Sequence, residues 1–465
     1  MTKFDELKKR FPNLIPVQEI RSNVSIIELA IHYGYLPKLH KGRKRPVLEN
    51  KAYDDVILIK HAHDANQQVY QSVGNFADSG TIINFIRNRL STVFSNFNKP
   101  GEDEFRNIVS VLYEYLRIDP EQVDLNRLAT KHLKEKRPNP VLPLNSLEFR
   151  PLEKDNYLLT RHISSETLNS PEFINRIATQ ITYFDPQNKQ VVDFATVKEN
   201  PQHKFILFSN VAFPYYNGLS TEVTGLEIRN KSSKLHAPGS NRLNSVFISN
   251  PPPKTAHFFI LESAIDALSL RQLRHIGGDN SFDSVYFSTG GQLTPQQVDT
   301  ITRYINSMKK VSNWKINLCF DRDTKGYIYD LQFIQQLLFT KFPLYPIATG
   351  LHSIGYALPT QKIYNSFKEE LLERIKVYNQ AIKLHPQTLL ETDAAESTSL
   401  IITINQTEDK IILSIPEADV PLSHFSKCLL ELSKLNKRLC INKSSAKDFN
   451  QDLEQESLKI YNQEN

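Results

Sequence analysis

The sequence predicts an α/β protein whose second half contains a parallel, doubly wound sheet. Residues 257–350 alternate between short, continuously apolar strands and amphipathic helices, a pattern typical of parallel strands covered by helices on both faces. Acidic residues stand directly after two of these strands, at the edge where such a sheet binds its ligands. The chain has 465 residues, 40% of them hydrophobic and 23% charged, which excludes a wholly disordered protein and allows about three domains.

The N-terminal part is expected to hold a small sheet flanked by helices. Residues 17–34 and 105–118 place apolar side chains at helical spacing. Between them, DVILIKH and QQVYQSV have the composition of strands, and FADSGTIINFIRNRL is expected to turn and enter a helix.

The rest of the chain alternates strands and helices with one interruption. Short strands are expected within residues 151–250, and the parallel strands are then expected at four segments: HFFIL, VYFSTGG, KINLCFDRD and LYPIATG. Residues 351–437 break this rhythm with a long helix, a hairpin and a further helix, so we expect an insertion. LCINKSSAKDFNQDL then supplies the fifth strand, a loop and a last helix.

Charge, cysteine content and the lack of long apolar runs exclude several classes of protein. Lys and Arg number 56 against 51 Asp and Glu, a net charge of +5, which permits nucleic-acid binding without requiring it. The three cysteines, Cys319, Cys428 and Cys440, cannot build a disulfide framework, and no C-x-x-C pair could form a cysteine zinc site. The start MTKFDELKKRF lacks a secretory signal, and no apolar run reaches the ~18 residues of a membrane span. We therefore expect a cytoplasmic protein without a membrane partner.

A set of acidic residues is the strongest indication of function in the sequence. Glu262 ends the first strand of the α/β segment, and Asp321 and Asp323 end the third. Because the carboxyl ends of parallel strands converge on one crevice, these carboxylates would repel one another unless a cation lay between them. Oxygen ligands of this kind suit Mg²⁺ or Mn²⁺, which also bind substrate phosphates. Each acid taken alone would instead be a cap of the helix that follows it.

These acids lie in segments that resemble a known family. Three segments are similar to the Toprim domain shared by bacterial primases, topoisomerases and some nucleases: FILESAIDALSL, FSTGG and CFDRDTKG. The resemblance implies a Rossmann-like sheet in which Asp321 and Asp323 hold Mg²⁺, while Glu262 binds metal or acts as a general acid or base. It also implies that three glycines support the site: Gly290, Gly291 and Gly326.

Further acids lie near this constellation. Asp266, one helical turn after Glu262, is either a carboxylate that supports the metal ligands or a local cap. Asp448, in SAKDFNQDL, matches the K-D-[WF]-N-x-x-L ending of primase-like Toprim proteins, and it either returns to the crevice or caps a loop. Asp330 shares the helix face of Asp323 and is expected to be a solvated charge.

The segment before the α/β half resembles the region that precedes Toprim in primase-like proteins of bacterial mobile elements. VAFPYYNGLSTEVTGLEIRNKSSKLHAPGSNR has the F-P-x-x-[ND] strand, the G-x-E-x-R strand and the basic G-S loop of that region. In related primases the equivalent subdomain guides template and nucleotides. The resemblance implies that four cations contact nucleic-acid or nucleotide phosphates: Arg229, Lys231, Lys234 and Arg242. Taken alone, the same loop would be an ordinary solvated one.

The N-terminal block resembles the zinc-ribbon domain at the start of bacterial primases. It keeps the strand pattern and the closing G-T-I-I-x-F-I, but no cysteine precedes Cys319, so a degenerate domain without zinc is expected. His61 and His63 are expected to be exposed strand residues. Contact with single-stranded DNA is expected from a basic stretch that includes Lys44 and Arg45.

The expected function follows from these resemblances. The expected parts are a degenerate zinc-ribbon-like domain with flanking helices (1–130), a linker (131–150), a primase-core-like α+β subdomain (151–255), the Toprim domain (256–350), an inserted α+β module (351–437), and the final Toprim strand and helix with the tail (438–465). We expect a primase-like, Mg²⁺-dependent nucleotidyltransferase that acts on single-stranded DNA and nucleotides in mobile-element replication or transfer. Its expected partner is a helicase, a relaxase or another element-encoded protein. Two alternatives stay open: a Toprim metal-dependent nuclease, for instance in phage defence, and a non-catalytic DNA-binding Toprim subunit.

Overall fold

The computed structural model describes two compact units. The described parts of the chain fall within residues 1–137 and 331–434 for one unit, and within residues 138–330 and 435–465 for the other. The described residues are 24–33, 35–38, 45–50, 55–65, 67–73, 78–90, 108, 111–112, 115, 142, 144–153, 156–231, 234–237, 239–291, 293–348, 353–359, 361–384, 400–406 and 411–464. Among them, no helix combines the length and the apolar character needed to cross a bilayer.

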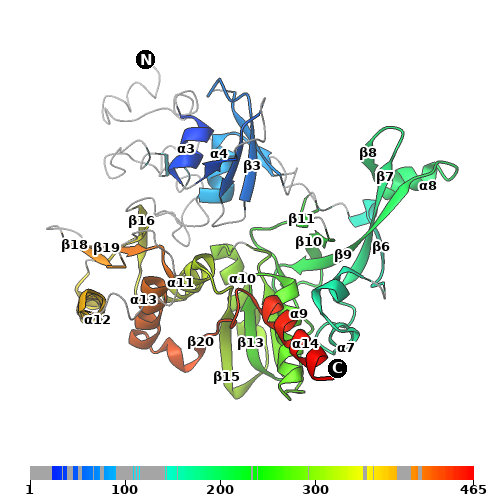
Figure 1. Cartoon of the computed structure of the whole chain (residues 1–465). Coiled ribbons are helices and arrows are strands. Elements are labelled where there is room, and N and C mark those ends of the chain that lie inside the picture. Colours follow the sequence, from blue (N-terminus) through cyan, green and yellow to red (C-terminus); the bar gives the residue numbers. More distant parts are fainter. Residues whose placement is uncertain are drawn as a thin grey trace. The chain divides into compact units, whose positions relative to one another are not determined.

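The N-terminal part forms an antiparallel meander whose strands follow in chain order (Figure 1). The strands are β1 (Leu36–Pro37), β2 (Val47–Asn50), β3 (Asp55–Lys60), β4 (Val69–Ser72) and β5 (Ser79–Gly80). The helical segments are α3 (Ile26–His32), α4 (Ile82–Phe85) and the π-helical turn η2 (Ile86–Leu90). Ser25 begins α3, because its Oγ accepts hydrogen bonds from two backbone N–H groups of the first turn. The strands predicted from DVILIKH and QQVYQSV are confirmed, and the helix predicted over 17–34 is described from Ile26 onward.

A buried arginine links the elements of this meander. Arg89 makes ion pairs of 2.7 Å with both Asp55 and Asp78, and only 7% of its side chain is exposed. Tyr35 donates a hydrogen bond to Asp55, and Tyr70 donates one to Asp78. One guanidinium therefore offsets one of the two negative charges, and hydrogen bonds from two phenols further stabilise the carboxylates.

The two histidines predicted as strand residues lie in a turn. β3 ends at Lys60, and His61 adopts a φ of +54°, a left-handed conformation that does not continue a strand. His61 and His63 are both exposed. The expectation of exposure is confirmed, whereas the placement in a strand is wrong, because the chain already turns toward β4.

A second, mixed sheet contains the parallel strands. It comprises β6 (Glu148–Pro151), β7 (Ala178–Asp185), β8 (Gln190–Val192), β9 (Ile206–Tyr216), β10 (Val223–Arg229), β11 (Lys234–His236), β12 (Val246–Ile248), β13 (Thr255–Leu261), β14 (Ser284–Ser288), β15 (Lys310–Cys319) and β20 (Leu439–Ile441). Its main order is β11-β10-β9-β12-β14-β13-β15-β20, and β7 joins β6 and β8 to β9. The strands β14, β13, β15 and β20 run parallel, whereas β12 pairs antiparallel with β14. Short strands are expected within residues 151–250, but the segments KFILFS and VAFPYY together form one long strand, β9.

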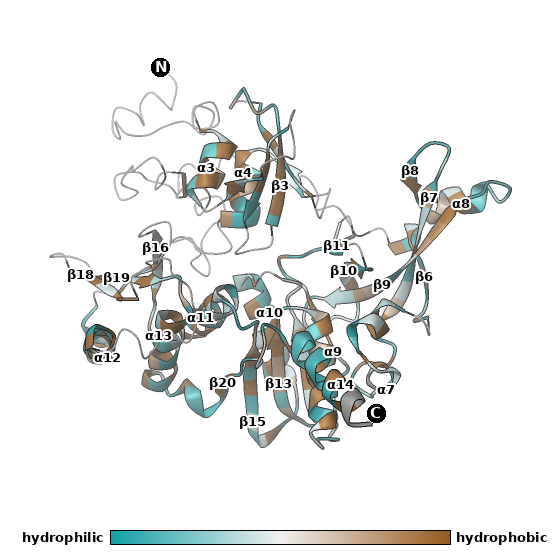
Figure 2. Cartoon of the chain, in the orientation of Figure 1, coloured by the Kyte–Doolittle hydropathy of each residue, from teal (hydrophilic) through white to brown (hydrophobic). Residues whose placement is uncertain are grey.

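Helices cover both faces of the parallel strands (Figure 1). The α-helices along this part of the chain are α7 (Ser165–Leu168), α8 (Phe194–Glu199), α9 (Ala264–Ile276), α10 (Pro295–Ser307), α11 (Thr324–Leu338) and α14 (Phe449–Glu464), and the 3-10 helices are η5 (Leu144–Ser146), η6 (Tyr157–Arg161) and η8 (Leu435–Lys437). On one face, Phe259 of β13 shares a buried cluster with Leu268 of α9 and Leu453 of α14. On the other face, the ring of Phe287 in β14 lies 5.4 Å from that of Tyr304 in α10. Figure 2 shows the hydrophobic residues concentrated on strands such as β13. The predicted doubly wound α/β sheet is confirmed.

The chain between α11 and β20 forms a separate antiparallel sheet. Its elements are β16 (Tyr345–Ala348), β17 (Ser353–Ala357), η7 (Lys362–Tyr364), α12 (Asn365–Leu384), β18 (Thr403–Gln406), β19 (Ile411–Pro416) and α13 (Asp419–Leu432), with strand order β16-β17-β19-β18. The prediction that LYPIATG forms a fourth parallel strand is therefore wrong. α11 is long enough to serve as the crossover to a further parallel strand, but β16 instead pairs antiparallel with β17, which follows after a short connection, and so joins the four-stranded sheet.

Candidate active site

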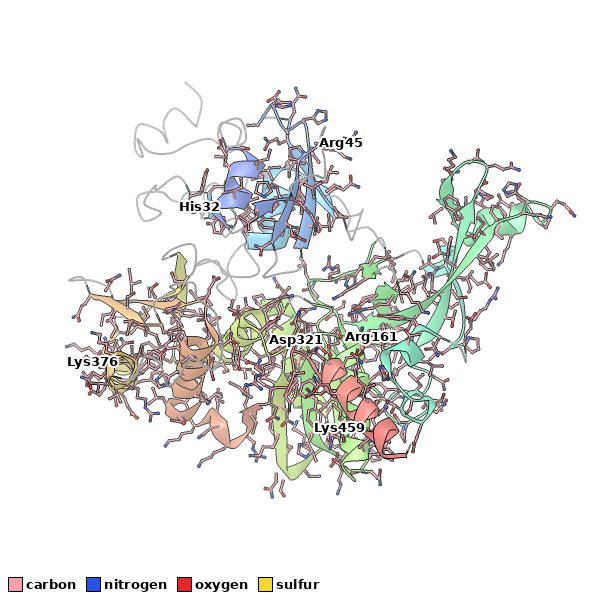
Figure 3. All side chains as sticks on the ribbon, viewed as in Figure 1. His32, Arg45, Arg161, Asp321, Lys376 and Lys459 are labelled. Atoms are coloured by element: carbon pink, nitrogen blue, oxygen red, sulfur yellow. The ribbon has the colours of Figure 1, made fainter. Side chains whose placement is uncertain are left out.

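Two neighbouring strand ends bring carboxylates together. Glu262 follows β13 and is 8% exposed, and Asp321 follows β15 (Figure 3). The strands pair in parallel up to Leu261 and Cys319, so both side chains leave the same edge of the sheet. Burial, and then the charge of Glu262, raise the pKa of Asp321 to about 9. A positive charge nearby would oppose this shift and favour the ionised carboxylate.

Asp323 lies at the start of α11. Its Oδ1 accepts a hydrogen bond of 2.9 Å from the Gly326 N–H, and 36% of its side chain is exposed. Position 326 requires glycine, because a Cβ there would lie 2.0 Å from the carbonyl oxygen of Asp321. The D-x-D turn thus packs directly on the first turn of the helix, which holds both aspartates at the end of β15.

Asp266 and Asp448 lie beside these carboxylates. Asp266 accepts hydrogen bonds from the Ser263 hydroxyl at 2.5 Å and from the Asn450 N–H at 3.3 Å. Asp448 begins α14 by accepting a hydrogen bond of 2.7 Å from a backbone N–H of the first turn. Burial and then the charge of Asp448 raise the pKa of Asp266 to about 6, and both charges also raise the pKa of Asp321. Asp448 is thus a cap of α14, whereas Asp266 links α9 to the first turn of α14, and both acids add negative potential at the site.

A lysine that sequence reasoning missed enters the site. Lys325 lies in the first turn of α11, and its Nζ donates a hydrogen bond of 2.7 Å to Oε1 of Glu262. The side chains are 9% and 11% exposed. The other oxygen, Oε2, is buried and accepts no hydrogen bond from any described residue. The lysine was visible in CFDRDTKG, but its position in the motif did not show that it turns inward.

The glycine turn after β14 closes on the end of β13. Gly290 and Gly291 have φ values of +79° and +113°, a conformation that side chains rarely adopt. The Gly291 N–H donates a hydrogen bond of 2.9 Å to the Glu262 carbonyl, and the Ser288 hydroxyl donates one of 3.3 Å to the same oxygen. The Tyr329 hydroxyl of α11 donates to the Gly291 carbonyl at 2.7 Å. The turn therefore fixes the backbone from which the Glu262 side chain extends.

Two of the predicted basic residues face the acids. The charge of Arg229, at the end of β10, partly offsets the raised pKa of Asp266. Lys234 begins β11, and its Nζ lies 3.2 Å from where a Cβ on Gly291 would be. Loss of solvation and then the charge of Arg229 lower the pKa of Lys234, whereas Glu262 opposes this shift. Arg229 and Lys234 thus lie within electrostatic reach of the carboxylates.

The other predicted basic residues lie elsewhere in the chain. Lys231 is exposed, and Arg242 is half-buried in the loop after β11, where its charge adds to the effect of burial in lowering the pKa of His236. Arg45 is exposed in the N-terminal meander (Figure 3). Lys44 lies outside the described residues.

A buried polar cluster backs the two site-facing cations. Glu227 is 0% exposed and accepts hydrogen bonds from the Tyr215 hydroxyl and the Arg229 Nε. Nη2 of Arg229 and both ring nitrogens of His236 are buried and have no hydrogen-bond partner among the described residues. Gly290 packs on this cluster, because a Cβ there would lie 2.7 Å from the Tyr215 hydroxyl oxygen. The site therefore contains buried nitrogen atoms that are not hydrogen-bonded to any described residue, and a bound ligand could supply their partners.

The chain after the insertion returns to the D-x-D turn. Lys443 donates hydrogen bonds to the carbonyl oxygens of Asp321 and the preceding residue at 3.2 and 3.1 Å, and it pairs with Asp330 at 2.7 Å. The Arg322 N–H donates to the Lys447 carbonyl at 2.6 Å. Asp330 is 0% exposed, so the expectation of a solvated charge is wrong. Its charge is compensated by a lysine that sequence reasoning did not connect with it.

The carboxylates have the chemistry of a divalent-cation site, but their side chains are not gathered around a single point. Among the residues that the structure describes, no three carboxyl, imidazole or thiol groups stand close enough together to hold a metal. Glu262 contacts Lys325 instead, and Asp323 contacts a backbone N–H. The unpartnered Oε2 of Glu262 and the raised pKa of Asp321 are both features that a nearby cation would relieve. The side chains therefore fit Mg²⁺ or Mn²⁺, provided that Glu262 leaves its lysine.

Comparisons with known proteins support the fold of this region. Residues 259–343 match a family described as Toprim-like, which confirms the Toprim resemblance over this range and includes Glu262, Asp321 and Asp323. A comparison with curated proteins finds no match. Among solved structures, one similar chain comes from a bacteriophage T7 complex in which lagging-strand DNA polymerase interacts with primase domains of two gp4 subunits bound to an RNA/DNA hybrid and dTTP. It is 16% identical, the match covers 49% of this chain and 90% of that one, and the TM-score of 0.21 adds nothing to the fold assignment.

Proposed function

We propose that the protein is a primase-like, Mg²⁺-dependent nucleotidyltransferase that joins nucleotides on single-stranded DNA. The observation that carries the proposal is the placement of the Toprim carboxylates Glu262 and Asp321 beside the cations Arg229 and Lys234 in one sheet. Phosphoryl transfer needs groups that hold a metal ion and groups that hold phosphates, and the carboxylates and the two cations would supply both kinds.

Asp321, Asp323 and Glu262 would hold the ion, once Glu262 has left Lys325. When bound, Mg²⁺ would neutralise phosphate charge and stabilise the transition state of the transfer. In that step a primer 3′-hydroxyl gives up its proton to solvent and attacks the α-phosphorus of a nucleoside triphosphate, the bond between the α-phosphorus and the bridging oxygen breaks, and pyrophosphate leaves. Asp266 and Asp448 keep the local potential negative, which favours a cation at this place. The contacts from the loop after β20 hold the D-x-D backbone in position.

The basic side of the site would bind phosphates. The unsatisfied Nη2 of Arg229 and the ammonium of Lys234 are donors that a phosphate of a nucleotide or of the DNA backbone would satisfy. Arg242 would extend this surface along the loop after β11. Binding through such contacts weakens as salt concentration rises, and it carries no sequence information.

The proposed setting is the replication or transfer of a mobile element in the cytoplasm, with a helicase or relaxase as partner. The F-P-x-x-[ND] and G-x-E-x-R segments support it, and they now prove to be β9 and β10, next to the Toprim-like range. The N-terminal meander, which lacks cysteine ligands, would contact the template through Arg45 and Lys44 without zinc. Genes for a helicase or relaxase beside this one would agree with the setting, whereas restriction-type genes would favour defence.

The test uses purified full-length protein with Mg²⁺ or Mn²⁺, single-stranded DNA and labelled nucleotides. We expect new oligonucleotides from the wild type and none from the Asp321→Asn/Asp323→Asn variant. The matched control is Glu454→Gln, which removes an exposed carboxylate of α14 outside the site and should leave synthesis intact. Shortened DNA that depends on the two aspartates would establish a Toprim nuclease instead. DNA binding without synthesis or cleavage would favour the non-catalytic subunit.

A further inference from the structure

The ion pair between Lys325 and Glu262 is a feature of the site that the proposed reaction does not explain. The Lys325 Nζ contacts Oε1 of Glu262 at 2.7 Å, and the ammonium also lies 5.5 Å from the centre of the Tyr329 ring. Both charged side chains are about nine-tenths buried, at 9% and 11% exposure. The pair is therefore shielded from solvent, and its attraction is stronger than that of a surface pair.

The position of Lys325 follows from the turn that precedes it. The Asp323 carboxylate accepts the Gly326 N–H, which starts α11 immediately after the D-x-D turn. The first turn of the helix then directs the Lys325 side chain to the end of β13, where Glu262 lies. The same motif that supplies the acidic ligands thus also supplies a cation to the site.

This cation competes for the carboxylate that a metal would need. One oxygen of Glu262 is taken by the ammonium, while the other is buried and unpartnered among the described residues. A divalent ion between Glu262 and Asp321 would bring two positive centres close together at low exposure to water, and they would repel each other.

We propose that Lys325 is a built-in counter-ion, which holds Glu262 while the metal is absent and must release it when the metal binds. The inference rests on the proposed function, because it takes the metal site of that reaction as given. Lys325 is a positioning residue in this scheme, since it acts through Glu262. In this scheme, the competition from Lys325 lowers the affinity of the site for divalent cations.

The test measures Mn²⁺ binding by electron paramagnetic resonance of the free ion, with full-length protein and without DNA or nucleotides. Lys325→Met keeps most of the side-chain volume and removes the charge, and we expect it to bind Mn²⁺ about tenfold more tightly than the wild type. The matched control is Lys447→Met, because that ammonium lies 3.9 Å from Asp323 with 64% of its side chain exposed. We expect it to change Mn²⁺ affinity by less than about twofold.

The outcomes separate this inference from the proposed function. Equal or weaker Mn²⁺ binding by a folded Lys325→Met protein would overturn the counter-ion role, and Lys325→Gln provides a second variant if the first does not fold. If Asp321→Asn leaves Mn²⁺ binding unchanged, the metal site itself is refuted and the proposed function fails with it. If Lys325→Met binds Mn²⁺ more tightly than the wild type, but the wild type transfers no nucleotides, the counter-ion role stands and the proposed reaction fails.

Discussion

Replacing Asp321 with Asn should stabilise the metal-free protein. The pKa of Asp321 is raised from 3.8 to about 9 in the folded chain, first by burial and then by the charge of Glu262. A carboxyl whose folded pKa exceeds its unfolded pKa favours folding in its protonated form, and this contribution is lost as pH rises from about 4 to about 9. Each pKa unit corresponds to ~1.4 kcal/mol. After discounting for the water that reaches this half-buried side chain, we expect Asp321→Asn to raise the free energy of unfolding by about 2–4 kcal/mol near pH 8.

The assay is urea unfolding in the presence of a chelator, followed by the fluorescence of Trp314. This residue is the only tryptophan of the chain and lies in β15, so its signal reports the sheet that carries the site. Wild-type stability should fall as pH rises over this range, whereas the stability of Asp321→Asn should fall less. Added Mg²⁺ should stabilise the wild type more than the variant, because a bound cation removes the repulsion that the variant already lacks. A variant less stable than the wild type in chelator at about pH 8 would refute the reasoning.

Three further predictions follow from the contacts of single residues. Arg89→Met leaves two buried carboxylates without their guanidinium and should weaken the N-terminal meander by about 3–5 kcal/mol, measured as faster amide hydrogen exchange in β3 and β4; unchanged exchange would contradict it. Gly326→Ala places a Cβ against the D-x-D turn and should weaken Mn²⁺ binding by about 10-fold to 100-fold in calorimetry, and full affinity would show that the turn adapts. Lys234→Ala should lower the slope of log affinity for single-stranded DNA against log salt by about 1, because the Lys234 Nζ lies at the Gly291 turn; Lys231→Ala, at a second exposed lysine, should change it less, and equal effects would argue against a specific phosphate contact of Lys234.

The carboxylate pair could be predicted from the sequence because it depends on local patterns. Apolar runs mark buried parallel strands, and the residue after each run lies at the ligand-binding edge of the sheet. Glu262 and Asp321 needed only this rule and are found at neighbouring strand ends. The glycine turn was equally local, since the positive φ values of Gly290 and Gly291 belong to a short turn after one strand.

Contacts between distant segments could not be predicted in this way. Lys443 lies 122 residues beyond Asp321, and no periodicity links the two positions. The partner of Asp330 is the same distant lysine, Lys443, so the sequence alone offers no reason to expect Asp330 to be buried. An apolar run also does not reveal which strand it will pair with, and for this reason LYPIATG was assigned to the parallel sheet instead of the inserted one.

The pairing of β20 with β15 has a consequence for the order in which a nascent chain acquires its structure. Ile316 pairs with Leu439, so this edge of β15 stays open until the ribosome has made the entire inserted module. An open strand edge can recruit strands from other chains, and closing a long loop is slow. The inserted segment, with its own sheet and helices, is synthesised during this interval. Late synthesis of residues 439–448 then covers the edge and supplies the Lys443 contacts in a single event. A chain that stalls earlier carries Glu262, Asp321 and Asp323 without the loop that contacts the D-x-D backbone.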